Sequence, residues 1–216
     1  MRKALVTSVC VLWAAGLAGG EDMFPPSWRG ESRTLFAVWD NWQGDLLPDQ
    51  WSSNPPQAKT PYAIAGPGTV VYQQADGRTN VVEMTQDFQL GFYLPNIPGG
   101  TSKEIILQVT YYVDAGFNPQ VLPQLEFASG EWGGQIEDYY PHGEGWITDV
   151  IRLEIEPNPE EEWIYLYARD QATWQYAWYP TYIDQVVIDT MCIPEPATLG
   201  LLAAGAAALL RRRRKR

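Results

Sequence analysis

The sequence predicts an all-β protein built as a single β-sandwich of jelly-roll type. Residues 103–113 and 147–156 alternate between apolar and polar side chains, which is the pattern of a strand with one face on a core and one in water. No stretch between residues 21 and 191 shows the 3.6-residue periodicity of an amphipathic helix. Prolines and glycines separate the apolar runs, as they do in the turns of sandwiches and barrels.

Short runs of β-branched and aromatic residues, bounded by Gly, Pro, Asn or Asp, define the expected strands, about eight to ten in all. Asp76-Gly77 separates two such runs and predicts a hairpin, because glycine adopts positive φ without a steric penalty. Asp40–Pro61 contains four prolines and is expected to be a long irregular connection. The expected strands are Thr34–Trp39, Thr69–Gln73, Asn80–Met84, Asp87–Leu94, Lys103–Val113, Ile147–Glu156, Trp163–Ala168 and Tyr182–Asp189.

The N-terminal end has the layout of a secretory signal peptide. Arg2 and Lys3 precede an apolar run from Ala4 to Ala18, and small residues follow before Glu21. A basic region, a hydrophobic region of roughly 7–15 residues and a small-residue cleavage site define such a signal. We therefore expect a signal helix over residues 1–20 that signal peptidase removes. The alternative is an uncleaved N-terminal anchor.

The C-terminal end combines a rigid motif, an apolar run and a cluster of cations. Pro194-Glu195-Pro196 is followed by Ala197–Leu210, which contains no charge, and then by Arg211–Arg216. Proline disfavours helix in the residue before it, so a membrane helix begins only after Pro196. The cations hold the end on the cytoplasmic side. A durable span needs about 20 apolar residues, so this short run predicts a transient anchor.

This order of features resembles the PEP-CTERM sorting signal of bacterial surface proteins, over roughly the last tenth of the chain. The resemblance implies processing by an exosortase-type membrane transpeptidase near Pro-Glu-Pro and association with the envelope or with an exopolysaccharide biofilm matrix. It divides the chain into a signal peptide (1–20), an extracytoplasmic β-sandwich (21–191) and a sorting and membrane-anchor segment (192–216). The alternative is an ordinary C-terminal membrane anchor with a basic stop. The residues that carry the resemblance are Pro194, Glu195, Pro196, Arg211, Arg212, Arg213 and Arg214.

The last expected strand carries a second resemblance. Its residues Ile183-Asp184-Gln185-Val186 resemble the final strand of exported carbohydrate-binding-type jelly rolls, in which an Ile-Asp-x-Val pattern precedes the linker to the anchor. The resemblance implies the jelly-roll form of the sandwich and names no ligand.

Between its two ends the chain is strongly acidic. Residues 21–191 contain seven of the 15 basic residues and 25 of the 26 acidic residues, which gives a net charge of −18. Nucleic acid and anionic lipid need Lys and Arg to neutralise phosphate, so the charge excludes them as partners of this body. Carboxylates suit Ca²⁺, but no spaced acidic loop specifies a site, and no cofactor is expected. Glu160-Glu161-Glu162 is expected to be a solvated turn.

The cysteines predict no disulfide within the secreted body. Cys10 leaves with the signal peptide, and Cys192 lies beside the Pro-Glu-Pro motif. A single exported thiol is consistent with an intermolecular bond, with lipid modification or with no bond at all. We expect no bond, with Cys192 in the anchored or discarded segment.

Aromatic residues are in excess in the body, which contains nine of the 10 tryptophans and all 12 tyrosines. Two segments carry rings at two-residue intervals, and in the first they alternate with Ile164, Leu166 and Ala168. Such a row presents flat apolar faces with N–H and O–H edges, as sugar-binding sites do. The alternative is that both strand faces are buried and the rings fill volume. The candidate ligand-stacking residues are Trp163, Tyr165, Tyr167, Trp174, Tyr176 and Trp178.

Catalysis finds little support in the sequence. His142 is the only histidine, and no P-loop or dinucleotide-binding glycine pattern is present. We therefore expect a non-catalytic surface or exopolysaccharide-matrix protein, with polysaccharide as a candidate ligand. The alternative is a small carbohydrate-active enzyme with two carboxylates about 5–9.5 Å apart. Its candidate acids are Glu126, Glu131, Glu137, Asp138, Glu144 and Asp149.

Overall fold

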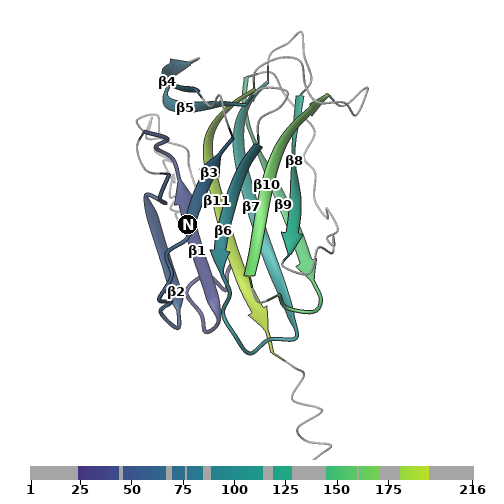
Figure 1. Ribbon diagram of the computed structural model, residues 1–216. Helices are drawn as coiled ribbons and strands as arrows, with labels where there is room; N and C mark the ends of the chain where they lie inside the picture. The colour runs from purple at the N-terminus through teal and green to yellow at the C-terminus, as the bar shows by residue number, and fades with distance from the viewer. Residues whose placement is uncertain are drawn as a thin grey trace, which may run out of the picture.

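Two antiparallel β-sheets pack face to face in the computed structural model (Figure 1). The structure describes residues 24–43, 46–66, 70–75, 77–84, 89–113, 119–127, 145–159, 161–170 and 181–194. In this part of the chain, seven strands form one sheet and four form the other, which fits the predicted sandwich. The strands are β1 (Thr34–Trp39), β2 (Gln50–Asn54), β3 (Tyr62–Ala65), β4 (Val70–Ala75), β5 (Arg78–Met84), β6 (Gln89–Pro95), β7 (Ser102–Val113), β8 (Pro119–Phe127), β9 (Gly145–Ile155), β10 (Glu161–Asp170) and β11 (Thr181–Ile193).

The long strand β11 is the centre of the seven-stranded sheet. Along one edge it pairs with β7, from Ile183 to Ile193. Along its other edge it pairs with two strands end to end, β1 over Val186–Met191 and β5 over Thr181–Ile183. Strands β9, β2 and β4 flank β7, β1 and β5. The strand that continues into the C-terminal tail is therefore hydrogen-bonded on both edges.

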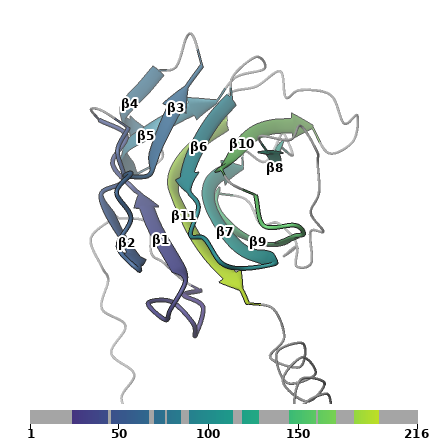
Figure 2. The ribbon, with the colours of Figure 1, turned by 60° about the horizontal axis from the view of Figure 1, so that its bottom comes forward.

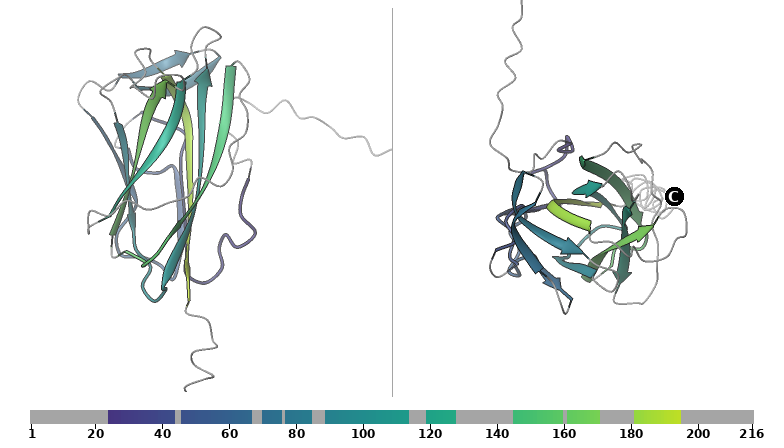
Figure 3. Two further views of the ribbon diagram at one scale, coloured as in Figure 1. Left: turned by 90° about the vertical axis from the view of Figure 1, so that its right-hand side faces the viewer. Right: turned by 90° about the horizontal axis from the view of Figure 1, so that it is seen from above.

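The four-stranded sheet has the order β3-β6-β10-β8. From β6 to β11, consecutive strands alternate between the two sheets, so the chain crosses from one layer to the other at every connection (Figure 2). Figure 3 shows the same two layers from the side and from above. Inward-facing side chains of both layers form one core.

The core consists mainly of aliphatic side chains, each of which contributes roughly 1.5–3 kcal/mol when fully buried. Trp39 and Trp42 extend it beside β1, and both contact Phe92 edge to face with ring centroids 4.8 and 6.3 Å away. The indole N–H of Trp42 donates to the Asp184 carbonyl oxygen at 2.8 Å. Central members of the core are Leu90, Phe92, Leu94, Ile105, Leu107, Val109, Ile151, Leu153, Ile164, Leu166, Val186 and Ile188.

β7 differs from the half-solvated strand that its alternation predicts, because the middle of its outer face is buried as well. Gln108 and Thr110 lie on the face away from the core and are nevertheless buried. The Phe24 amide donates to the Gln108 side-chain oxygen at 3.0 Å, and the Thr110 and Thr148 hydroxyls lie 2.8 Å apart. The segment before β1 thus covers part of this face, which a sequence pattern within β7 does not reveal.

All eight expected strands are present, with ends that move by a few residues. The predicted hairpin is confirmed, since Ala75 pairs with Arg78 and Gly77 has φ of 82°. Three strands were not expected. β2 is an exposed, polar edge strand inside the supposedly irregular Asp40–Pro61 segment, so that prediction was wrong. β3 is only four residues long, and β8 begins with proline and contains a second one, which an edge strand tolerates.

The expected signal helix (1–20) and the apolar C-terminal run lie outside the described residues. The part of the chain that the structure describes contains no helix with the length and apolar character needed to span a membrane.

β11 continues through Cys192 to Ile193, two residues beyond the boundary that the sequence suggested. Cys192 is buried and free, and its thiol donates to the Ile97 carbonyl oxygen at 3.0 Å. Burial raises the pKa of this thiol. Gly100 lies against the same strand end, where a Cβ would be 2.9 Å from the Ile193 carbonyl oxygen. The tail thus leaves from a well-packed end of the sandwich, opposite the β4–β5 hairpin (Figure 1).

Candidate functional site

Four aromatic side chains from three neighbouring strands form an aromatic strip on the outer face of the four-stranded sheet: Tyr62, Tyr93, Trp163 and Tyr165. Strand register brings them together, because Trp163 of β10 is opposite Tyr93 of β6, and Tyr93 is opposite Tyr62 of β3. Cross-strand partners share one face of a sheet. The adjacent positions on these strands, such as Phe92 and Ile164, point into the core. The rings therefore face away from the core.

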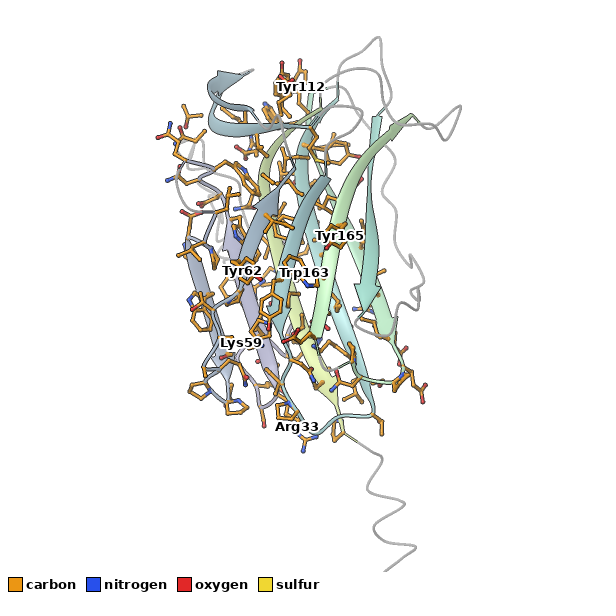
Figure 4. The ribbon with its side chains drawn as sticks, in the orientation of Figure 1. Arg33, Lys59, Tyr62, Tyr112, Trp163 and Tyr165 are labelled. Atoms are coloured by element: carbon orange, nitrogen blue, oxygen red, sulfur yellow. The ribbon has the colours of Figure 1, made fainter. Side chains whose placement is uncertain are left out.

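The rings of the aromatic strip contact one another in a continuous row (Figure 4). Tyr62 stacks on Tyr93 with centroids 4.9 Å apart, and both contact Trp163 at 5.5 and 5.4 Å. Trp163 and Tyr165 stack with centroids 5.9 Å apart and an angle of 12° between their planes. Tyr62 and its neighbour Ile64 are 37% and 40% exposed, and Trp163 and Tyr165 are half-buried. Contiguous apolar surface is one feature of interaction sites.

Gly91 allows the Tyr165 ring to lie directly over β6. It is the cross-strand partner of Tyr165, and a Cβ at this position would be 2.7 Å from the tyrosine Cε1 and 2.9 Å from Ile64 Cγ1. Atoms do not approach that closely, so any larger residue must displace the ring. In β-sheets, an aromatic side chain on the neighbouring strand often covers a glycine and fills the space that its missing side chain leaves.

We expect Gly91→Ala to lower the free energy of unfolding by about 1–3 kcal/mol, because the added methyl group overpacks the strip. Urea denaturation followed by tryptophan fluorescence measures the loss. In a Tyr165→Ala background the same substitution should have a smaller effect, since the closest contact is gone. Equal losses in both backgrounds would contradict this account of the glycine.

A polar group borders one side of the aromatic strip. The Lys59 ammonium lies 2.5 Å from Glu161 Oε1 and donates to the Tyr93 hydroxyl at 3.1 Å. Tyr93 in turn donates to Glu161 at 3.2 Å. These contacts raise the pKa of Lys59 and lower that of Glu161, mainly through their mutual hydrogen bond. Burial raises the pKa of Tyr93, so the phenol stays protonated at neutral pH. The site thus offers ring faces beside a cation, a carboxylate and a hydroxyl.

The structure places two of the six candidate stacking residues, Trp163 and Tyr165, in this strip. The side chain of Tyr167 and all of Trp174, Tyr176 and Trp178 lie outside the described residues. Sequence reasoning missed Tyr62 and Tyr93. Tyr93 is in an expected strand, but only the register with β10 shows that it meets Trp163.

The acids of the alternative enzymatic interpretation are only partly described. Asp149 is buried, and its Oδ2 accepts a hydrogen bond from the Tyr111 hydroxyl at 2.6 Å. Glu126 is the backbone partner of Trp163 on β8. Residues 131, 137, 138 and 144 lie outside the described part of the chain.

A second acidic group lies where β1 ends. The Asp40 amide donates to Asp49 Oδ2 at 2.9 Å. Burial, a hydrogen bond with Asp49 and repulsion from its charge raise the pKa of Asp40 from 3.8 to about 6. Among the described residues, no three His, Cys, Asp or Glu side chains lie close enough together to hold a metal ion.

The raised pKa of Asp40 predicts a pH-dependent stability. Because the folded protein holds this proton more tightly than the unfolded chain, the contribution is complete below about pH 3.8 and is lost as the pH rises through about 6. Asp40→Asn should therefore stabilise the protein at pH 8 by about 1 kcal/mol, allowing for partial exposure, and change little at pH 4. Urea denaturation at both pH values checks this, and a pH-independent difference would contradict it.

Two comparisons with known proteins bear on the tail. The family model of the PEP-CTERM protein-sorting motif matches residues 193–215. No curated protein sequence matches the chain significantly. The match begins at Ile193, the last residue of β11, so the motif follows the folded domain directly. Pro194 is exposed beyond the strand, and the other sorting residues lie outside the described part. The chain therefore carries a PEP-CTERM protein-sorting motif, which implies an exported protein that a membrane-bound exosortase processes and that is associated with the membrane or the cell surface.

Proposed function

We propose that this protein is a non-catalytic component of the bacterial envelope or extracellular matrix that binds polysaccharide through its aromatic strip. The observation that carries the proposal is the continuous row of four rings on the outer sheet face, in which Tyr62 is exposed, Trp163 and Tyr165 are half-buried and Tyr93 is buried, with Ile64 exposed beside the row. Tyrosine and tryptophan present a rigid apolar face with a polar edge, which suits the apolar faces and hydroxyl groups of sugar rings. The neighbouring Lys59 and Glu161 supply charged hydrogen-bonding groups for hydroxyls.

The attachment of the tail supports a surface role for the domain. β11 is held by hydrogen bonds on both edges, so a force applied through the tail acts on a strand that is paired on both sides. β11 ends at one end of the sandwich, whereas Tyr62, Trp163 and Tyr165 of the aromatic strip lie on its flank, away from that end (Figure 4). The alternation of β6–β11 between the sheets supports a jelly-roll order for this sandwich.

The test is a polysaccharide binding assay with the purified protein, for example co-sedimentation with insoluble glycans and titration with the exopolysaccharide of the producing cells. Trp163→Ala and Tyr62→Ala should each weaken binding at least tenfold, since central aromatic residues are typical hot spots. Trp51→Ala is the matched control, because Trp51 is a 36% exposed tryptophan on β2 of the other sheet. Circular dichroism and thermal melting verify folding of each variant.

Unchanged affinity in Trp163→Ala and Tyr62→Ala, or an equal loss in Trp51→Ala, would contradict the site. Absence of binding to every glycan would leave a structural module.

Processing is tested separately, because mass spectrometry of the mature protein locates both termini. We propose cleavage near Pro194, and an intact tail on the mature surface protein would refute this.

A further inference from the structure

A lysine and a glutamate lie wholly buried between the two sheets. Lys103 is on β7 of the seven-stranded sheet, and Glu162 is on β10 of the four-stranded sheet. Both side chains are 0% exposed, and Nζ lies 2.8 Å from each carboxyl oxygen. The expectation that Glu160–Glu162 is a solvated turn was therefore wrong for Glu162, because the β10 register turns its side chain inward beside Ile164.

The surroundings of this pair are apolar. Cross-strand neighbours share its face, and these are Cys192 and Ile155 for Lys103 and Leu94 for Glu162. All three are buried. Burial raises the pKa of Glu162, although the adjacent Lys103 charge acts in the opposite direction. A charged pair in such a place carries a desolvation penalty of several kcal/mol per ion, which proton transfer to a neutral amine and a carboxylic acid removes.

We propose that Lys103 and Glu162 condense to an isopeptide bond that covalently joins the two sheets. The ammonium first passes a proton to the carboxylate. The neutral Nζ then attacks Cδ, the C–N bond forms, the C–O bond breaks, and the hydroxyl group leaves as water with a proton from nitrogen. No oxidant or reductant is needed.

The geometry favours this step in three ways. The reacting groups are held at contact distance in the folded protein, and groups held together reach effective molarities of about 10⁵–10⁸ M once a small rotation of the carboxyl group aligns them. Because both oxygens lie 2.8 Å from Nζ, either can accept the ammonium proton and become the hydroxyl that leaves as water, while the other stays as the amide oxygen. The exclusion of water removes the hydration that, in solution, stabilises the ammonium and carboxylate ions and keeps them from reacting.

The neighbouring residue provides an internal control. Glu161 precedes Glu162 on β10, points to the opposite face and contacts Lys59 at 2.5 Å. The Lys59 and Glu161 side chains are 65% and 46% exposed, so water stabilises both ions and prevents condensation. Of two adjacent glutamates that each contact a lysine, the one inside the core should thus react and the one outside it should remain separate.

Such a bond would give the domain a covalent cross-link. Its described residues contain no disulfide, since Cys192 is free. The bond links residues 59 positions apart and lies beside the end of β11 from which the tail leaves. Unlike a disulfide, it resists reduction. Cross-links that close long loops restrict the unfolded chain most strongly.

The test is mass spectrometry of the folded, purified full chain after denaturation and digestion with trypsin and a second protease. We expect a branched peptide that contains Lys103 and Glu162, lighter than its two components by one water molecule, with no tryptic cleavage after Lys103. Peptides with Lys59 and Glu161 should be separate. Recovery of Lys103 and Glu162 in separate, unmodified peptides would overturn the proposal.

A second measurement uses Lys103→Arg, whose guanidinium keeps the positive charge but is not deprotonated in proteins and so cannot attack. The wild-type chain should migrate faster than this variant in denaturing electrophoresis, because a cross-linked chain is more compact. Equal migration of the two chains, with or without reductant, would also overturn the proposal. This inference does not depend on polysaccharide binding, so either proposal can fail alone.

Discussion

Glu162→Ala is expected to lower the free energy of unfolding by about 3–5 kcal/mol, because it removes the partner of a buried charge and, with it, the proposed cross-link between the sheets. The substitution leaves the Lys103 ammonium in the core, where its cross-strand neighbours are Cys192 and Ile155. Neither provides a countercharge, and water does not reach the site because Lys103 is fully buried. The loss appears as a lower urea midpoint.

Glu161→Ala is the matched control for this substitution. It removes the same side chain from the adjacent residue, but its partner Lys59 is solvated once the pair is broken. Stability should therefore change little. Comparable losses in the two variants would show that burial does not distinguish the adjacent glutamates. A double Lys103→Met, Glu162→Met variant should recover the part of the loss that comes from the unpaired ammonium, because apolar residues of similar volume often replace buried ion pairs without net destabilisation, but not the part that comes from the cross-link.

Arg29→Ala should also lower the free energy of unfolding by about 3–5 kcal/mol, because it removes the cationic partner of a buried carboxylate, that of Asp189. Asp189 lies on the central strand β11 and its side chain is fully buried. Arg29 donates to both carboxylate oxygens, from Nε at 2.6 Å and from a terminal nitrogen at 2.5 Å. Its guanidinium also lies 4.0 Å from the centroid of the Phe36 ring. The segment before β1 is thereby held on the outer face of the large sheet.

Arg152→Ala is the control for that variant. Arg152 pairs with Glu104 at 3.0 Å on the same sheet, with its side chain 49% exposed, so the loss should stay below about 1 kcal/mol. Urea denaturation compares the two, and limited proteolysis reports whether residues 24–33 detach in Arg29→Ala. Similar stability of the two arginine variants would contradict the role assigned to Arg29.

Local patterns predicted those features that depend on a short stretch of chain. The strand at Trp163–Ala168 was recognised from alternation alone, and its aliphatic members Ile164 and Leu166 do enter the core. The sorting motif is equally local, because its chemistry lies in consecutive residues and the family match recovers it. The polar β2, the short β3 and the proline-containing β8 escaped prediction, since pairing with a neighbour rather than their own sequence makes them strands.

The sequence by itself determined that the chain is an all-strand, acidic domain followed by a sorting tail, because alternation, charge and motif order are properties of neighbouring residues. Only the tertiary structure decided which residues meet. Register between strands distant in sequence brings Tyr62 and Tyr93 to Trp163. The packing of the two sheets brings Glu162 to Lys103, while Glu161 on the other face of β10 stays in solvent. The physical reason is that burial and cross-strand contact depend on the partner strand, which no local pattern specifies.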